Sequence, residues 1–231
     1  YSSPRRSMRA SMFVASLDAK DAESRNHVVR TAETAIRVGE RFRLSPRELR
    51  ELGLAAMLHD IGKVNLPDEI LQSTLRLTDE QYDAVEQHPV DGEAMLLTDD
   101  TLASIAPIVR SHHERVDGRG YPDGLIGQEI PLAARIIAVC DAFDAMTNDR
   151  TYRQALPAGM ALAVLNEHAG SQWDPLVIAQ LVAVLPSLAA AGRLDMVVRG
   201  APFERDAAAG DAAAGELNDF ENLLVSVDAE I

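Results

Sequence analysis

The sequence is short of cysteine and of aromatic residues. Cys140 is its only cysteine, so no disulfide can form within these 231 residues, and a reducing compartment, the cytoplasm, is expected. Aromatic residues make up 4% of the chain, whereas strands favour aromatic and β-branched residues. The hydrophobic fraction of 47%, dominated by Ala, Leu and Val, is ample for a packed core. We therefore expect an all-α fold.

Positive charge is also scarce. The 22 Lys and Arg residues are outnumbered by 36 Asp and Glu, which gives a net charge of -14 and an isoelectric point near 4.8. Duplex nucleic acid and anionic membranes both attract an excess of Lys and Arg, so neither is an expected partner. A phosphate substrate stays compatible with this acidity, because bound divalent metal ions reverse the local charge.

Long hydrophobic runs are missing as well. The segment from Pro175 to Gly192 carries no charge, but Gln180, Pro186 and Ser187 interrupt it. A membrane span needs roughly 20 apolar residues, so this segment is predicted to be a buried helix. The basic start of the chain is followed only by the short apolar stretch 12–15, which does not predict a secretory leader.

Capping residues and prolines divide the chain into helical segments. Ser45-Pro46-Arg47-Glu48 combines a capping box with proline at the first helical position, and the helix is expected to run toward His59. Thr78 and Gln81 predict a second capping box, and Pro89 is expected to end or kink the helix that follows it. Further helices are predicted over about 21–43, 101–113 and 131–145, and after Pro157 and Pro175. The count is seven or more helices.

A glycine-rich segment separates two of these helices. Between Glu114 and Pro131 the chain has four glycines and a proline, which predicts a long, shaped loop. Farther along, residues 206–215 repeat Asp-Ala-Ala-Ala-Gly, a composition typical of a linker. We predict a lead-in over residues 1–19, a helical domain over 20–192 and an extension over 193–231. The last stretch either frays or forms a docking helix.

Five of the six histidines lie beside carboxylates, glycine or proline at expected helix ends: His27, His59, His88, His112 and His113. Any single one is more often a surface or core residue, but imidazole is the commonest metal ligand, and five together predict a metal site. Asp141 lies in the otherwise apolar segment 136–143. A buried carboxylate needs a partner, and a metal ion is favoured over a buried ion pair.

The His59-Asp60 pair ends an apolar helix, where the two side chains can splay to bind one ion or to bridge two. Gly62 is expected to permit a sharp turn there, after which Lys63 would point its cation toward the metals. Glu23 and His27 are spaced i, i+4, so on a helix they share a face and can meet one metal.

The ordered motifs from about Lys20 to Val182 resemble those of the HD-GYP family, a branch of the HD-superfamily phosphohydrolases. The matching motifs are DAESRNH at 21–27, LHDIGK at 58–63, HPVDG at 88–92, HHE at 112–114, DGRGYPDGL at 117–125, DAFDAMT at 141–147 and DRTYR at 149–153. Several ordered motifs of this length are far more specific than a lone His-Asp pair.

The resemblance implies a helical phosphodiesterase that opens cyclic di-GMP to linear pGpG, to GMP or to both, using two or three divalent ions. Iron and manganese are the implied metals, and nickel accepts the same ligands. By motif position, the implied ligands are Glu23, His27, His59, Asp60, His88, His112, His113 and Asp141, and Glu23 would help to hold a third metal. Asp60 would bridge two metals, whose clamp generates a hydroxide nucleophile near neutral pH.

The resemblance also implies which residues contact the substrate: Lys63, Tyr121, Arg150 and Arg153, with Lys63 acting beside Asp60 in catalysis. Cations, and arginine above all, suit phosphate oxygens. Pro122 favours extended backbone at Tyr121, so this ring is expected to project toward the ligand.

Three departures from the family pattern bear on substrate preference. Thr151 stands where proline is usual, Asn65 replaces a frequent glycine, and residues 73–75 replace a Lys-Pro-Gly turn. Two other functions remain open: a cyclic di-GMP receptor or interaction module with negligible turnover, and an HD-type hydrolase of another nucleotide phosphoester. The family's habit also implies fusion to a sensor or receiver domain, and a homodimer is a further expectation.

Overall fold

The computed structural model describes residues 24–71, 73, 76–149 and 154–190. Its helices are α2 (Ser24–Arg41), α3 (Pro46–Leu58), η1 (Ile61–Asn65), α4 (Asp68–Leu71), α5 (Asp79–Glu86), α6 (His88–Leu97), η2 (Ala103–Ile105), α7 (Ala106–Arg110), η3 (Gly127–Glu129), α8 (Leu132–Thr147), α9 (Ala158–Glu167) and α10 (Pro175–Ala190). Over these residues the only β-type pairings are two isolated bridges. The predicted all-α class with at least seven helices is confirmed. The predicted lead-in, linker and docking helix lie outside the described residues.

The local start signals are confirmed at α3 and α5. At α3 the Glu48 backbone N–H donates to Ser45 Oγ at 3.3 Å, and the Ser45 N–H donates to Glu48 Oε2 at 2.7 Å. Thr78 and Gln81 make the same reciprocal pair at α5. As expected from Pro89, α5 ends, and α6 begins at His88 with the proline in its first turn.

The predicted helix over 101–113 is wrong in its extent. The structure has a short 3₁₀ turn, η2, and then α7, which has Pro107 in its first turn and ends at Arg110. Proline lacks the N–H that would continue the preceding turn as α-helix, so the helix restarts at this position. His112 and His113 therefore lie in the turn beyond α7, and their side chains are not restricted to one helix face.

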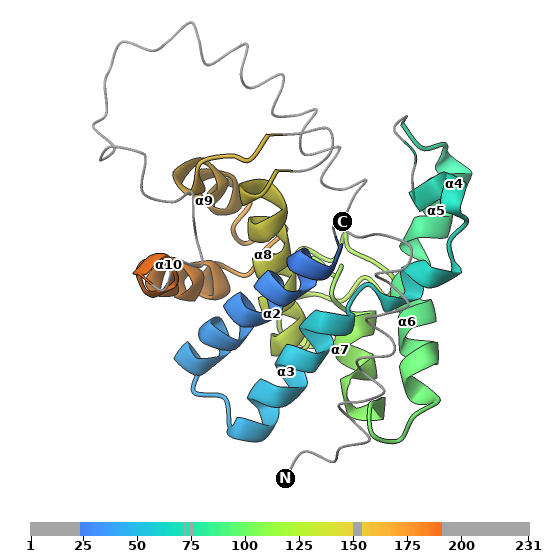
Figure 1. Cartoon of the computed structure of the whole chain (residues 1–231), viewed down its shortest axis with the longest axis horizontal. Helices are drawn as coiled ribbons and strands as arrows, with labels where there is room; N and C mark the ends of the chain where they lie inside the picture. The colour runs from blue at the N-terminus through green and yellow to red at the C-terminus, as the bar shows by residue number, and fades with distance from the viewer. Residues whose placement is uncertain (1–23, 72, 74–75, 150–153, 191–231) are drawn as a thin grey trace, which may run out of the picture.

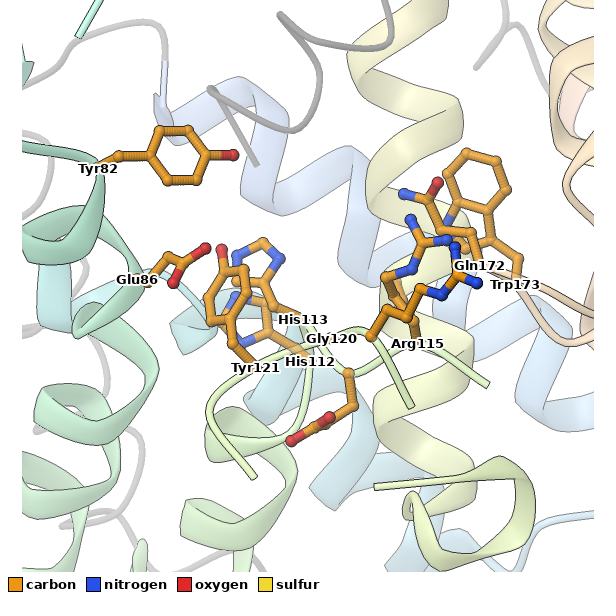
Figure 2. Close-up of a pocket in the computed structure, with 12 residues that line it drawn as sticks. Tyr82, Glu86, His112, His113, Arg115, Gly120, Tyr121, Gln172 and Trp173 are labelled. Atoms are coloured by element: carbon orange, nitrogen blue, oxygen red, sulfur yellow. The ribbon is translucent and has the colours of Figure 1, made fainter. Parts of the chain in front are cut away.

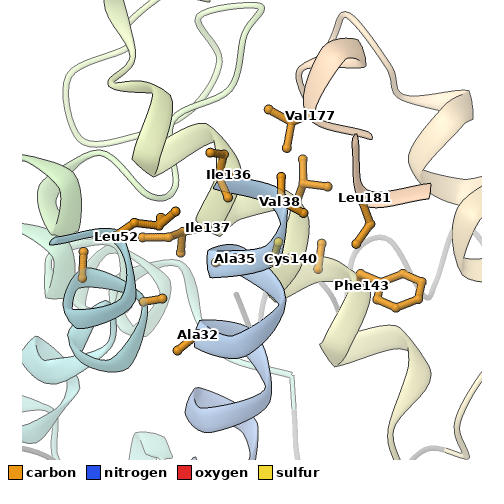
Figure 3. Packing of buried hydrophobic residues seen from close by; sticks show 14 of the residues in the cluster. Ala32, Ala35, Val38, Leu52, Ile136, Ile137, Cys140, Phe143, Val177 and Leu181 are labelled. Carbon is orange, nitrogen blue, oxygen red and sulfur yellow. The ribbon is translucent and has the colours of Figure 1, made fainter. Parts of the chain in front are cut away.

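The core forms where α2, α3, α8 and α10 pack together. Ala35 and Val38 of α2, Leu52 of α3 and Ile137 of α8 are fully buried (Figure 3). On the other side of α8, α10 adds its own buried face, with Leu181 beside Phe143 in this view. The uncharged segment is thus a core helix, as predicted, and no helix in the described part of the chain has the length and apolar character to cross a membrane.

Helix α8 (yellow-green) lies between α2 and α9, and α6 lies on the far side of α7 (Figure 1). This arrangement brings the end of α3, the start of α6 and the turn after α7 toward the middle of α8. Since the predicted ligands lie at these places in the sequence, the packing of the helices sets the geometry of the site.

Gly62 has a different role from the predicted one. The described glycines with positive φ are Gly118, Gly124, Gly127 and Gly170, so Gly62 does not make a left-handed turn. A Cβ at position 62 would instead lie 2.0 Å from the His88 carbonyl oxygen and 2.7 Å from the Gly92 nitrogen. Glycine is required because the start of α6 packs directly on this backbone, which places His88 beside Asp60.

Candidate metal centre

The imidazoles and acids that are scattered in the sequence converge in space. Their ligand atoms form two groups, within each of which all atoms lie within 4.8 Å of one another: Asp60 with His88, His112 and His113, and Asp60 with His27 and His59. Asp60 belongs to both groups. Each group has the composition of a metal site, with imidazole nitrogens and a carboxylate donated by separate elements.

Three of these imidazoles are oriented by the backbone. In each, Nδ1 lies within hydrogen-bond distance of the carbonyl oxygen three residues earlier, at 2.8 Å for His59, 2.7 Å for His88 and 2.6 Å for His112. A carbonyl oxygen only accepts, so Nδ1 carries the proton and donates it. Nε2 is left with its lone pair, which is the form of histidine that binds metal ions.

The Nε2 lone pairs point at other acceptors. His88 Nε2 lies 3.3 Å from His112 Nε2 and 3.3 Å from Asp60 Oδ1, and His59 Nε2 lies 3.2 Å from Asp60 Oδ2. For His88 and His112, whose pKa burial lowers, the one ring proton is already donated from Nδ1, so no hydrogen is available to join their Nε2 atoms. A shared cation resolves such contacts, so the arrangement fits metal ions.

Buried atoms without a partner point the same way. Within the described residues, His59 Nε2, Asp60 Oδ1 and His113 Nε2 are buried and make no hydrogen bond, although Lys63 Nζ forms an ion pair with Asp60 Oδ1 at 3.1 Å. An unsatisfied buried polar atom costs about 1–3 kcal/mol, and more where it is charged. Three such atoms in one cluster are accounted for together if they bind metal.

The protonation states also suit metal binding. Burial, reinforced by the neighbouring imidazoles, holds the pKa of His112 and His113 well below the ordinary histidine value. Burial lowers the pKa of His88 as well. For Asp60, burial alone would raise the pKa, but His59 and Lys63 outweigh it and hold the pKa well below its usual range. His88, His112 and His113 are thus neutral beside an ionised carboxylate. Burial alone would lower the pKa of His59, but Asp60 outweighs it and raises the pKa.

His27 is held between two carboxylates of α8. Its Nε2 lies 2.8 Å from Asp141 Oδ1 and its Nδ1 lies 2.7 Å from Asp144 Oδ2. Burial alone would lower the pKa of His27, but both carboxylates raise it, to about 9. A proton on Nε2 joins His27 to Asp141, so these two predicted ligands lie in direct contact.

Asp141 lies at the edge of the cluster rather than inside either four-atom or three-atom group. Its Oδ1 is 3.7 Å from His59 Nε2, and its side chain is 6% exposed. Burial alone would raise the pKa of Asp141, but hydrogen bonding to His27 outweighs it and lowers the pKa. The predicted ligand is therefore an ionised carboxylate within reach of two histidines.

Asp144 was not singled out from the sequence. It accepts hydrogen bonds from Arg30 Nε at 2.7 Å and Arg30 Nη2 at 2.9 Å, in addition to its contact with His27. Its signal in the sequence is its place three residues after Asp141, in the same apolar helix. Such an outer carboxylate fixes the orientation of a ligand histidine.

Lys63 and Tyr121, both predicted to contact substrate, lie beside the cluster. Lys63 Nζ is 3.1 Å from each oxygen of Asp60. The Tyr121 ring, which is expected to project toward the ligand, lines the pocket and stacks on His113, with ring centroids 4.8 Å apart and an interplanar angle of 27°. One face of this ring is therefore already covered. Glu23, Arg150 and Arg153 lie outside the described residues.

The glycine-rich loop is folded back onto the His112-His113 turn. The buried carboxylate of Glu114 accepts hydrogen bonds from the backbone N–H groups of Asp123, at 2.7 Å, and Leu125, at 2.9 Å. At Gly120 a Cβ would lie 2.3 Å from the Arg115 nitrogen. Glu114 is a second residue that sequence reasoning missed, although it directly follows two predicted ligands.

A pocket of about 150 Å³ opens over the histidines. Figure 2 shows Tyr82 and Glu86 of α5 on the side where Tyr121 lies, and Arg115, Gln172 and Trp173 on the opposite side. The remaining lining residues are His112, His113, Glu114, Arg119, Gly120 and Ala138. None of the α5 residues or the α9–α10 turn residues was expected to face the site. Their roles depend on long-range packing.

Known proteins share both the sequence and the fold. A family model described as HD domain matches residues 12–177. The chain is 37% identical over 174 residues to the cyclic di-GMP phosphodiesterase response regulator RpfG of Xanthomonas campestris, covering 74% of this chain and 46% of the relative. It is 39% identical over 167 residues to a cyclic di-GMP phosphodiesterase of Pseudomonas aeruginosa, covering 72% and 40%.

A third relative carries a different substrate in its name. The chain is 35% identical over 165 residues to the 3'3'-cGAMP-specific phosphodiesterase 3 of Vibrio cholerae, covering 71% of this chain and 36% of the relative. The chain therefore spans less than half the length of these curated relatives.

Among solved structures, a cyclic GMP-AMP specific phosphodiesterase of Vibrio cholerae matches with a TM-score of 0.62 and 16% identity, covering 96% of this chain and 60% of that one. An HDGYP protein of Bdellovibrio bacteriovorus matches with a TM-score of 0.56 and 22% identity, covering 71% and 52%. At these identities the likeness shows a shared fold.

Proposed function

The chain belongs to the HD domain family, and from that membership we propose that it is a metal-dependent phosphodiesterase that hydrolyses cyclic di-GMP to linear pGpG, to GMP or to both. The observation that carries the proposal is the convergence of His59 and His88 Nε2 on the Asp60 carboxylate, in a cluster whose His112 and His113 line an open pocket. Relatives whose names state cyclic di-GMP hydrolysis support the choice of substrate.

We propose two or three divalent ions, iron or manganese, with nickel accepting the same ligands. One ion would be held by Asp60 with His88, His112 and His113, and another by His27, His59 and Asp60 with Asp141 at its edge. Glu23 would add a ligand for a third. Bound ions of this kind activate water for in-line attack on phosphorus and offset the charge on its oxygens.

The chain's own residues prepare the site for an anionic substrate. The backbone carbonyls that accept from His59, His88 and His112 keep each Nδ1 protonated. Each ring is therefore held with its Nε2 facing the cluster. Lys63 places a cation 3.1 Å from Asp60, where it can attract a phosphate toward the cluster. Tyr121, Arg150 and Arg153 remain the predicted contacts to the rest of the ligand.

A second candidate substrate is 3'3'-cGAMP, because relatives named for this substrate match over a similar share of the chain, 71% and 68%. The two substrates differ only in one base, so the metal ligands do not discriminate between them. Location in the cytoplasm, a homodimer and fusion to a sensor or receiver domain also stay predictions.

The test is a product assay on anaerobically purified protein, with metal content measured on the same sample. We expect linear product from cyclic di-GMP with Mn²⁺ or Fe²⁺, and little hydrolysis of mononucleotide phosphoesters. His88→Ala removes a proposed metal ligand. It should reduce activity by more than the roughly 100-fold that is lost when a residue hydrogen-bonded to a metal ligand is removed. His168→Ala is the matched control, since His168 is in neither ligand group.

Two results would contradict this proposal. If the protein binds cyclic di-GMP but releases no linear product with either Mn²⁺ or Fe²⁺, the chain is a receptor module. Preferential hydrolysis of a mononucleotide would make it an HD-type hydrolase of another phosphoester.

A further inference from the structure

The pocket continues past the histidines to an end that the proposed chemistry does not use. Arg115, Gln172 and Trp173 line this end, and Arg119, whose backbone N–H donates to the Asp117 carboxylate that Arg115 also binds, lines the pocket as well. Figure 2 shows Arg115, Gln172 and Trp173 gathered together, away from Tyr121. Two arginines on one pocket wall are notable in a chain with a net charge of -14.

The wall is built from two distant parts of the sequence. The N–H of Val116 donates to the Gln172 carbonyl at 3.3 Å, and the N–H of Asp117 donates to the Ser171 carbonyl at 2.9 Å. These bonds fasten the glycine-rich loop to the turn between α9 and α10. Trp173, which is 4% exposed, packs into the core behind them. This end of the pocket is therefore held in place by backbone bonds and a buried ring.

The two arginines differ in what they already bind. Arg115 donates to the Asp117 carboxylate through Nε at 3.1 Å and Nη2 at 2.9 Å. The same carboxylate accepts the backbone N–H of Arg119 at 3.1 Å. No ion pair within the described residues involves the Arg119 guanidinium, which is exposed at the pocket wall. The charges of Arg115 and Asp117 thus offset each other. The Arg119 guanidinium supplies a positive charge whose N–H groups can donate hydrogen bonds to a ligand.

We propose that this end of the pocket is a base subsite in which Arg119 reads the O6/N7 edge of a guanine of the bound cyclic dinucleotide. The inference rests on the proposed function and deepens it. Guanine offers two adjacent acceptors on that edge, which match the parallel donors of a guanidinium. Adenine has an amino donor in place of O6, so it opposes one of the two hydrogen bonds. The subsite therefore favours guanine over adenine.

The experiment compares cyclic di-GMP, 3'3'-cGAMP and cyclic di-AMP in wild-type protein and in Arg119→Ala. We expect Arg119→Ala to lower kcat/KM for cyclic di-GMP by about tenfold or more and to change that for cyclic di-AMP by less than about twofold. Arg119→Lys should restore little, because an ammonium does not form the bidentate contact. Arg47→Ala is the control, since it removes the same charge from an exposed ion pair on α3.

Binding is measured independently of turnover through Trp173. It is the only tryptophan in the chain, so fluorescence excited beyond the nucleotide absorption band reports the arrival of ligand at this end of the pocket. The midpoint for cyclic di-GMP should rise in Arg119→Ala by the same factor as kcat/KM falls, and should not rise in Arg47→Ala.

The outcomes separate this inference from the proposed function. An equal loss with all three dinucleotides would make Arg119 a phosphate contact and overturn the base subsite, as would no loss at all. If wild-type protein binds cyclic di-GMP through this end but hydrolyses nothing, the subsite stands and the proposed hydrolysis fails. If Arg119→Ala hydrolyses cyclic di-GMP as well as the wild-type protein does, the base subsite is overturned and the proposed hydrolysis stands.

Discussion

Four of the five ligand histidines of the proposed centre are held by a specific second contact. Backbone carbonyls perform this task for His59, His88 and His112, and the side chain of Asp144 performs it for His27. A carbonyl cannot be altered by substitution, but Asp144 can. The α8 carboxylate is therefore the place where the orientation of a ligand can be tested apart from the ligand itself.

Asp144→Asn keeps the size of the side chain and removes its charge. Arg30 loses its carboxylate partner, and only one oxygen remains to accept from both Arg30 and His27. We expect metal affinity and activity to fall by about 10–100-fold, the usual cost of losing an outer carboxylate. Metal titration of the purified variant measures the metal affinity, and the product assay measures the activity. Asp100→Asn, at an exposed turn, should change neither quantity; full metal affinity in Asp144→Asn would refute this role.

The sequence motifs predicted which residues gather but not how they touch. His59-Asp60 and His112-His113 are recognisable because adjacent ligand-type residues at helix ends are rare without a reason. Asp144 and Glu114 were missed because their function depends on partners more than a hundred residues away or on the fold of a loop. The sequence also does not reveal that one face of Tyr121 is covered by His113.

At the scale of elements, the contact between η1 and α6 aligns Asp60 with His88. Gly62 leaves no room for a side chain, because its Cβ would lie 2.0 Å from the His88 carbonyl oxygen. Backbone atoms, unlike the end of a flexible side chain, cannot move aside without moving the whole helix.

Gly62→Ala should therefore lower the free energy of unfolding by at least the roughly 1–3 kcal/mol typical of overpacking, and should reduce metal content in the folded fraction. Gly159→Ala, in α9, is the matched control. No atom lies within 4 Å of a Cβ at position 159, so this change should be neutral or stabilising by up to about 1 kcal/mol. Urea unfolding of both variants measures the difference, and equal stabilities would contradict the close-contact explanation.

The glycine-rich loop depends on one carboxylate in a comparable way. In Glu114→Gln a single oxygen remains to accept from Asp123 and Leu125, and the new amide places a donor against one of these N–H groups. We expect a loss of about 1–3 kcal/mol in stability. KM for cyclic di-GMP should rise more than kcat falls, because the loop carries Tyr121 and Arg119 but no proposed metal ligand. A variant with unchanged KM would argue against a positioning role.

Helix starts could be predicted and helix lengths less well. The boxes at Ser45 and Thr78 are local, since donor and acceptor lie three residues apart, and both form as expected. The segment from Thr101 to His113 read as one helix because its apolar spacing is regular. Pro107 divides it, and the turn that results is what frees His112 and His113 to face the cluster.

Over the whole molecule, composition predicted the all-α class, but the packing of α2 against α8 follows from contacts that no local pattern encodes. That packing collects polar atoms at the centre of an apolar core. His59, His88 and Asp60 are all buried, and two of their atoms, His59 Nε2 and Asp60 Oδ1, make no hydrogen bond. In the absence of metal the site opposes folding, since each such atom has lost water without gaining a bond.

Metal ions should for this reason stabilise the entire fold. A ligand that binds only the native state, at 100 times its dissociation constant, adds about 2.7 kcal/mol. For a domain of this size, that corresponds to a rise in Tm on the order of 5–10 °C. Thermal unfolding with Mn²⁺ and with a chelator measures the effect. Mg²⁺ should raise Tm less, because it prefers oxygen ligands to imidazole, and Asp60→Asn should abolish the rise, because Asp60 belongs to both ligand groups. If Tm is the same with Mn²⁺ and with chelator, the lone pairs of these histidines serve some purpose other than holding metal.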